Sequence, residues 1–454
     1  MPSIVVYPLD DLAALDRAVS DEMSDRQAVI ARHWAYYRRE HRRPLKVRGG
    51  QADDNVILNL TREVIDQSVA MLFGTAPDFE LDQADETAEE RALEAMWEGN
   101  HLPLWCQDVG VTGAVAGHVY VKLSPTALGG VRLIRLNPRY VTLCWRADDF
   151  ETVLAYRLQW QSGDNFSRQD VVDLGGSWLV RDLTMTRGAR DWTVTGEVVW
   201  PWAWAPIVDW KNLPNPEGPY GQPELVNPEL NDVANFVASN TARILKFHAH
   251  PKTVGTGMQA TEIKETAVDG LWTVSNPAAQ IKNLEMQSDL GSSAAFLEFV
   301  QAQFYAEHRA VNLASMKDRI GQLTNFGLRT LFKSALDKLQ TKRSLYGMGL
   351  AEVSRRALLL MGYGDWPVSV SWCDPLPYNR LEQVQALQLE RDMQIVSRKT
   401  VATELGRDWE TEQARIEDED ASQGNVGEAL LRVFDQGQGV SMPRANKELG
   451  NDVG

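Results

Sequence analysis

Histidines and carboxylates at short spacing are the residues of this sequence that could bind a metal ion. His248 and His250 are two residues apart, and this spacing aims both imidazoles at one ion only on a strand or in a loop. No carboxylate cluster accompanies them, and the acidic run 417–420 lacks the glycine and the ligand spacing of a calcium loop. The sequence therefore predicts no metal site, but a polar helix end at the histidines and a solvated helix face at 417–420.

The motifs of nucleotide-binding and hydrolytic enzymes are absent from the sequence. It contains no GxxxxGK[ST] phosphate loop, no GxSxG elbow and no HExxH helix. Gly255-Thr-Gly-Met follows Pro251–Val254 without a βαβ unit, so a turn is favoured over a dinucleotide fingerprint. Cys106, Cys144 and Cys373 are widely spaced, which favours three buried, reduced thiols. We predict no catalytic residue and no cofactor.

The charge of the chain is acidic overall and basic in two places. The sequence has 46 Lys and Arg against 62 Asp and Glu, a net charge of −16, which disfavours a simple nucleic-acid-binding protein. One basic island lies at 38–48, and a second lies at 309–343, where eight cations face only Asp318 and Asp337. The eight are Arg309, Lys317, Arg319, Arg329, Lys333, Lys338, Lys342 and Arg343.

These cations could contact phosphates or form salt bridges with acidic helices of another subunit. For Lys317 and Arg319 the sequence leaves both interpretations open. For the cations of the long helix, from Arg329 to Arg343, it favours salt bridges.

Hydrophobic periodicity predicts an α+β chain with helices on both sides of a strand-rich middle. Helices are predicted over 8–40, 55–73, 86–97, 104–116, 225–247, 294–313 and 326–361, with short acidic helices from 381. Strands are predicted over 118–123, 131–136, 140–145, 152–160, 178–182, 192–199, 271–274, 280–285 and 368–372. Residues 316–325 form a polar break before the last long helix. No run of 18 apolar residues occurs and the N-terminus lacks the features of a signal peptide, so we expect no membrane span.

Several short motifs recur in an order that is typical of one family. The first helix ends in Tyr36-Tyr37, followed by His41, and Asn55–Asn59 leads into a helix that closes at Leu72-Phe73-Gly74. Two helices flank a small insert, and a polar loop then leads into the long helix. Near the end come Val396–Gly406 and an acidic segment, Asp408–Glu419. Over most of 30–420 this order resembles the portal (connector) proteins of tailed double-stranded DNA bacteriophages, but the Trp200–Trp210 run and the tail 421–454 match no portal pattern.

The resemblance implies an elongated α+β subunit with a helical stem, an α/β wing, a small α/β clip and a helical crown. The implied divisions are a wing at 1–225, stem helices at 226–250 and 292–315, a clip at 251–291, a tunnel loop at 316–325, a long wing helix and strand at 326–372, and a crown with a C-terminal tail at 373–454. It also implies a ring, usually of twelve subunits, at one vertex of the capsid.

The same resemblance implies a channel for packaging and ejecting double-stranded DNA. The implied partners are the terminase, a head–tail adaptor, the major capsid and scaffold proteins and DNA itself, with no membrane, in a virion assembled in the host cytoplasm. The residues implied to face DNA in the tunnel loop are Lys317, Arg319, Gln322, Thr324 and Asn325. Those implied at the junction of stem and clip are Arg243, Lys246, His248, His250 and Lys252.

Two other functions remain open from the sequence. Fifteen tryptophans and many carboxylates are compatible with a carbohydrate-active enzyme of another fold, although no carboxylate pair stands out. Another virion ring, such as a head–tail adaptor, is the second, but the chain is long for that role. If the chain does form a DNA channel, its net negative charge predicts a wall along which DNA slides rather than one that binds it tightly.

Overall fold

The computed structural model describes most of the chain, in two compact units, Met1–Leu376 and Pro377–Gly454. It describes residues 12–47, 53–81, 87–146, 148–249, 252–256, 278, 280–284, 290–316, 325–376 and 380–417. Helices and antiparallel sheets both occur, so the predicted α+β class is confirmed. Among the described residues, no helix combines the length and apolar character needed to cross a membrane.

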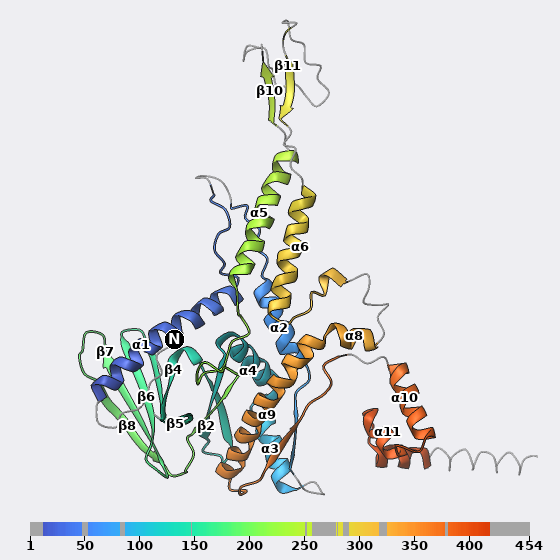
Figure 1. Ribbon diagram of the computed structural model, residues 1–454. Helices are drawn as coiled ribbons and strands as arrows, with labels where there is room; N and C mark the ends of the chain where they lie inside the picture. Colours follow the sequence, from blue (N-terminus) through green and yellow to red (C-terminus); the bar gives the residue numbers. More distant parts are fainter. Residues whose placement is uncertain are drawn as a thin grey trace, which may run out of the picture. The chain divides into compact units, whose positions relative to one another are not determined.

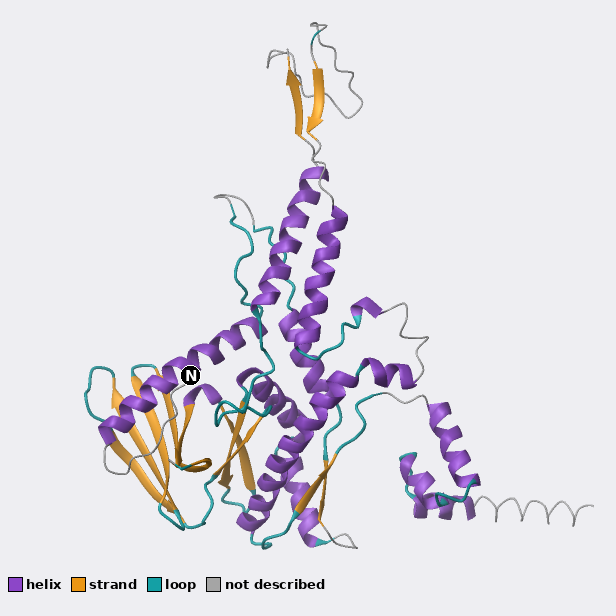
Figure 2. Ribbon diagram, viewed as in Figure 1, coloured by secondary structure: helices purple, strands orange, loops and turns teal. Residues whose placement is uncertain are grey.

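The strand-rich middle of the first unit forms two antiparallel sheets (Figure 2). A five-stranded meander contains β4 (Val141–Arg146), β5 (Asp149–Ser162), β6 (Asn165–Asp173), β7 (Trp178–Thr186) and β8 (Thr193–Trp200). A three-stranded sheet has the order β3 (Val131–Leu136), β2 (His118–Pro125), β9 (Ile207–Lys211). The six strands predicted here are confirmed, and β6 and β9 are additional. β6 escaped prediction because polar residues occupy both of its faces over 165–170.

Four helices surround the main hydrophobic core of this unit. They are α2 (Leu60–Phe73), α3 (Ala88–Gly99), α4 (Leu102–Ala116) and α9 (Lys333–Met361). Tyr346 and Leu350 of α9 are completely buried among residues of α2, α4 and β9. A short antiparallel pair, β1 (Asp78–Leu81) with β12 (Val368–Ser371), closes one side of this core. The predicted strand at 368–372 is thus confirmed.

Two helix predictions were wrong, one in its start and one in its continuity. The helix expected from Asn55 begins at Leu60, because the Asn59 side chain accepts the Arg62 N–H and caps it. The helix expected over 326–361 is two helices, α8 (Asn325–Leu331) and α9, separated at Phe332. There the backbone leaves the helical region (φ −84°, ψ 2°), and the buried Phe332 ring joins an apolar cluster with Val311 and Leu376.

The first helix and the α5–α6 pair complete the unit (Figure 1). Helix α1 (Leu12–Tyr37) lies against β4 and the 3-10 turn η1 (Pro138–Tyr140). Helices α5 (Glu229–Ala249) and α6 (Leu290–Glu307) lie side by side and run in opposite directions, and a short 3-10 turn, η3 (Ala314–Met316), follows. Strands β10 (Lys252–Thr256) and β11 (Gln280–Leu284) pair antiparallel. The strand predicted over 280–285 is confirmed, while the one at 271–274 lies outside the described residues.

The tryptophan-rich segment, for which the sequence indicated no role, is part of the core. Trp210 is buried against α9, where Gly349 leaves room for its ring. A Cβ atom at Gly349 would lie 2.4 Å from Trp210 Cδ2, closer than any atom can approach. Trp202 and Trp204 stack on each other, and the Arg356 guanidinium lies 5.0 Å from the Trp204 ring centre. The segment therefore ties the sheets to α9 by aromatic packing.

The second unit contains short helices in the part that is described. They are α10 (Arg380–Asp392), α11 (Arg398–Glu404) and a further helix over 409–417. Ser397 caps α11 by accepting the Thr400 N–H. These helices agree with the short helices predicted after residue 381.

Candidate functional site

The loop singled out by the sequence is described only at its two ends. Lys317, Arg319, Gln322 and Thr324 lie outside the described residues, and Asn325 opens α8. The segment 308–316, which leads from α6 into the loop, is described. The contacts of this segment therefore show how the loop is attached to the rest of the first unit.

Two side chains from other helices hold the beginning of this segment. Lys338 Nζ donates to the His308 carbonyl oxygen at 2.8 Å. The Gln67 side chain bonds to both backbone groups of Val311, accepting from its N–H at 2.9 Å and donating to its C=O at 3.0 Å. Between them Arg309 adopts the left-handed conformation (φ 50°), which turns the chain out of α6. The start of the loop is thereby fixed to α2 and α9.

Lys338 also belongs to a buried ionic cluster centred on Glu224. Its Nζ lies 2.8 Å from Glu224 Oε2, while Lys342 Nζ bonds to Oε1. The Ser68 hydroxyl donates to Glu224 Oε1 at 2.8 Å and accepts from Lys342. The side chains of Glu224 and Lys342 are completely buried and that of Lys338 is 6% exposed. Every charged atom of the cluster thus has a charged or hydrogen-bonding partner, as burial of charge requires.

The electrostatics of this cluster favour an ionised carboxylate. Burial by itself would raise the pKa of Glu224, but the ammonium groups of Lys342 and Lys338 lower it to about 2. Burial lowers the pKa of Lys342, and the nearby carboxylate opposes this effect. Glu224 is therefore an anion over the whole range of pH in which proteins normally work.

The proposed roles of Lys338 and Lys342 were wrong. The sequence placed both among cations that contact phosphates or form salt bridges with another subunit. In the structure both form ion pairs with Glu224 of the same chain. Helical spacing contained the correct signal, because 338 and 342 continue the buried stripe of Tyr346 and Leu350 at intervals of four. The partner Glu224 follows Pro223 in an irregular segment, and no local pattern connects it with α9.

Three other cations of the same island also have partners within the chain. Arg329 pairs with Asp374, and Lys333 with Asp337 one turn along α9. Arg343 donates to the carbonyl oxygen of Cys373. Cys106 and Cys144 are buried as predicted, but Cys373 is exposed, because it follows β12 at the surface.

A ladder of polar side chains on α5 binds the extended segment before α2. Asn231, Asn235 and Ser239 are spaced four apart and all are completely buried. Asn235 Oδ1 accepts the Leu58 N–H at 2.7 Å, and Ser239 Oγ accepts the Val56 N–H at 2.9 Å. Asn231 donates to the Leu58 carbonyl and accepts from both the N–H and the hydroxyl of Thr61. The predictions from the sequence do not include this ladder, although its four-residue spacing is visible there.

The next rung of the ladder contains residues that the sequence placed at the junction of stem and clip. Arg243 Nη2 lies 2.9 Å from Asp54 Oδ1, and Lys246 Nζ lies 3.6 Å from its Oδ2. His248 lies in α5 and Lys252 begins β10, while His250 lies outside the described residues. Among the described residues, no group of three His, Cys, Asp or Glu side chains could hold a metal ion.

The motifs that resemble those of portal proteins form hydrogen bonds near this ladder. Tyr36 OH donates to Asp232 Oδ2 on α5 at 2.7 Å, and Tyr37 OH donates to Asp66 on α2 at 2.9 Å. Asn59 donates to the Tyr37 carbonyl at 3.0 Å, and its Oδ1 lies 3.3 Å from His41 Nε2. The Tyr-Tyr, His and Asn motifs therefore join α1, α2 and α5.

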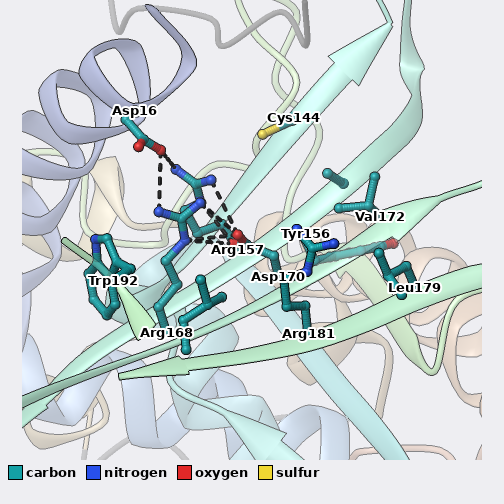
Figure 3. A pocket seen from close by; sticks show the side chains of 12 residues that line it. Asp16, Cys144, Tyr156, Arg157, Arg168, Asp170, Val172, Leu179, Arg181 and Trp192 are labelled. Atoms are coloured by element: carbon teal, nitrogen blue, oxygen red, sulfur yellow. Dashed lines mark hydrogen bonds and ion pairs between the residues drawn. The ribbon is translucent and has the colours of Figure 1, made fainter. Parts of the chain in front are cut away.

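A cavity of about 230 Å³ lies on the five-stranded sheet and contains a second buried ionic cluster (Figure 3). Arg157 and Arg168 point toward each other between Asp170 of β6 and Asp16 of α1. Each arginine Nε lies 2.8 Å from an Asp170 oxygen. Burial raises the pKa of Asp170, and Arg157 opposes this. Because both guanidinium groups bond to both carboxylates, the cluster acts as a tie between α1 and the sheet.

Comparison with known proteins connects this geometry with one family. Residues 229–425 match the family described as phage portal protein, SPP1 Gp6-like. The match begins at the first residue of α5 and includes α6, the loop, α8 and α9. The resemblance to portal proteins predicted from the sequence is thus confirmed for this part of the chain. No curated protein sequence matches the chain.

Solved structures of gene transfer agent particles are similar to the chain at low identity. The neck of an empty particle, computed with C6 symmetry, is 13% identical, with a TM-score of 0.49, and the match covers 77% of this chain and 90% of that one. A chain in the virion of the native particle is 13% identical, with a TM-score of 0.42, and covers 77% and 89%. The neck of the native particle, computed with C12 symmetry, is 12% identical, with a TM-score of 0.45 and the same coverage.

Replacing Glu224 by glutamine tests the buried cluster. We expect the E224Q variant to lose about 3–5 kcal/mol of unfolding free energy at pH 7, because two buried lysines lose their anionic partner. The ordinary pKa of 4.5 falls to about 2 on folding, so the stabilisation by Glu224 is present above pH 4.5 and is lost between pH 4.5 and 2. The difference between E224Q and the wild type should therefore shrink toward zero at pH 2 in denaturant titrations. Glu94→Gln on the exposed side of α3 is the control, and a difference that does not vary with pH would contradict the assignment.

Replacing Asn231 by alanine tests the ladder on α5. Because this change leaves the Leu58 carbonyl and two groups of Thr61 without partners, we expect a loss of about 2–4 kcal/mol. Hydrogen exchange of residues 55–61 should accelerate in the same variant. Asn240→Ala, at an exposed position one turn after Phe236, should change neither quantity. Equal exchange rates in the two variants would show that the ladder does not hold the segment.

Proposed function

We propose that this chain is the subunit of a phage portal, a ring at one capsid vertex through which double-stranded DNA is packaged and ejected. The observation that carries the proposal is the match of residues 229–425 to the portal family, because this segment contains the α5–α6 pair, the loop and α9. In this proposal the chain has a structural role without catalytic chemistry. It works in the virion after assembly in the host cytoplasm.

Exposed apolar side chains on α5 and α6 support assembly of the chain into a ring. Phe236 and Leu245 of α5 are 49% and 50% exposed, and Phe296 and Phe299 of α6 are 49% and 58% exposed. The two phenylalanines of α6 stack on each other with ring centres 6.4 Å apart. Large exposed apolar side chains are typical of protein–protein contacts. A ring of identical subunits, for which we propose twelve, would cover such side chains on every subunit.

The parts of the subunit take portal roles in this proposal. Helices α5 and α6 form the stem within 226–250 and 292–315, and residues 251–291 form the clip. The wing comprises 1–225 with 326–372, and the crown comprises 373–454. The clip meets the terminase and later the head–tail adaptor, while the capsid and scaffold proteins surround the ring.

The loop 316–325 faces DNA in the channel in this proposal. Lys317, Arg319, Gln322, Thr324 and Asn325 supply cations and hydrogen-bond donors that suit phosphate oxygens. The support is that three neighbouring cations, Lys338, Lys342 and Arg329, form ion pairs within the chain, while the start of the loop is fixed to α2 and α9. A loop on a rigid base keeps its contacts at a constant depth in a channel. The net charge of −16 of the whole chain suits a duplex that must slide.

The ring is tested by the state of the purified chain. Negative-stain microscopy and native mass spectrometry should show a monodisperse ring with a central hole. Replacing Phe236 and Phe299 together by glutamate should shift the protein toward monomers, because burying two carboxylates in the contact is costly. Asn240→Glu with Gln303→Glu, which adds the same charge at exposed polar positions of the same helices, is the control. A compact wild-type monomer of about 51 kDa at all concentrations would contradict the proposal.

The role of the loop is tested by shortening it. Replacing residues 318–324 by a Gly-Ser pair should leave ring assembly intact, because the anchors at 308–311 and α9 are unchanged. DNA packaging, measured as DNase-protected DNA per particle, should fall strongly. Normal packaging by rings that contain the shortened loop would exclude this role.

A further inference from the structure

Strand β8 leaves one edge of the five-stranded sheet open. It pairs with β7 along one side, and within the described residues no strand pairs with its other side. Val194, Val198 and Val199 of β8 are 51%, 65% and 57% exposed. An open edge with apolar side chains readily pairs with another chain, and soluble proteins normally protect such edges. Among the described residues, no second strand covers β8 in the isolated subunit.

A second open edge lies beside a groove on α9. β12 pairs only with β1 among the described strands, and a two-stranded sheet has little stability of its own. A groove of about 560 Å³ lies between β12 and α9, and none of its lining residues belongs to β1. The groove therefore lies on the side of β12 that β1 leaves unpaired.

The walls of this groove suit the side chains of a strand. Ser344, Gly347 and Ala351 are spaced along one side of α9, and their small size leaves the space open. Val368 and Val370 of β12 form the opposite, apolar wall. Apolar side chains that entered the groove would thus be buried against a helix on one side and a strand on the other.

The groove and β8 carry opposite charges. Among the described residues, Arg343 is the only charged residue that lines the groove, and Glu197 is the only charged residue of β8. The Arg343 guanidinium lies over the Trp372 ring, at 5.5 Å, and its Nε is buried without a hydrogen-bond partner among the described residues. Glu197 is half exposed and bonds to Arg181 of the neighbouring strand. Its carboxylate has further acceptor capacity for a second arginine.

We propose that β8 of one subunit docks into the groove between α9 and β12 of the next subunit, where it adds a third strand to the β1–β12 sheet. A ring needs two different complementary surfaces on each subunit, and this chain has an open apolar edge and an open groove. Pairing satisfies the backbone groups of both edges. Val194 and Val199 fill the groove, and Glu197, which lies on the same face of β8, approaches Arg343. The inference rests on the proposed ring and names one of its contacts.

Photo-crosslinking from β8 tests the contact without assuming a register. p-Benzoylphenylalanine in place of Val198 should, in assembled rings, form links to 340–351 or 368–372 of another subunit, identified by mass spectrometry of mixed light and heavy subunits. The same probe at Leu128, which is 98% exposed in the turn between β2 and β3, should give no link to these residues. Links from Val198 to other segments, or no links in intact rings, would overturn the inference.

Filling the groove is the second test. A Cβ atom at Gly347 would meet only Trp372 Nε1, at 3.7 Å, which is an ordinary van der Waals contact, and Gly347 lines the groove. We therefore expect the rest of a leucine side chain at this position to extend into the groove rather than into the core. Gly347→Leu should therefore give a folded monomer, since leucine is also the better helix former, with an assembled fraction reduced about tenfold or more. Gly347→Ala, which leaves most of the groove open, should assemble normally.

The two tests separate this contact from the ring itself. A wild-type chain that forms no ring contradicts the proposed function and this inference with it. Rings that form normally in Gly347→Leu contradict only the contact.

Discussion

The buried carboxylate of Glu224 is the interaction on which the centre of the first unit depends. It lies in an irregular segment far along the chain from its partners, and it joins α2 through Ser68 and α9 through two lysines. Removing three charges from water is costly, and only complete pairing compensates for this cost. Movement of any one of these segments would leave a buried charge without a partner. The cluster therefore makes the relative positions of α2, α9 and the segment at 308 strongly interdependent.

Polar groups hold the neighbouring elements by the same principle. The ladder Asn231, Asn235 and Ser239 replaces the hydrogen bonds that the extended segment before α2 would otherwise make to water. Tyr36 and Tyr37 add bonds from the end of α1 to α5 and α2. Buried polar networks tolerate few alternative arrangements, because each misplaced group loses its partner. In the proposed portal, this framework is the rigid support around a loop that must meet moving DNA.

The sequence predicted the elements better than it predicted their contacts. Alternating strands at 118–199 and the long helical periods are properties of neighbouring residues, and these were confirmed. The break at Phe332 was missed because the apolar period continues through it. The cluster that buries this ring with Val311 and Leu376 joins distant segments, so the local sequence does not reveal it. The start of α2 was placed too early because Asn55–Asn59 includes apolar residues at a spacing that also suits a helix. Their backbone groups bond to α5 instead.

The sequence by itself determined the α+β class, most helices and strands, and the order of motifs that resembles portal proteins. These depend on periodicity, capping and turn residues, which act over a few positions of the chain. Only the tertiary structure decided which cations form ion pairs within the chain and which can contact a partner outside it. Lys338 and Lys342 look like surface charges in the sequence, but Glu224, more than a hundred residues away, pairs with both. The physical reason is that the state of a charge depends on its burial and on its partners in space. The helical spacing of 338 and 342 indicates their burial, but their partner lies in a distant segment that no local pattern identifies.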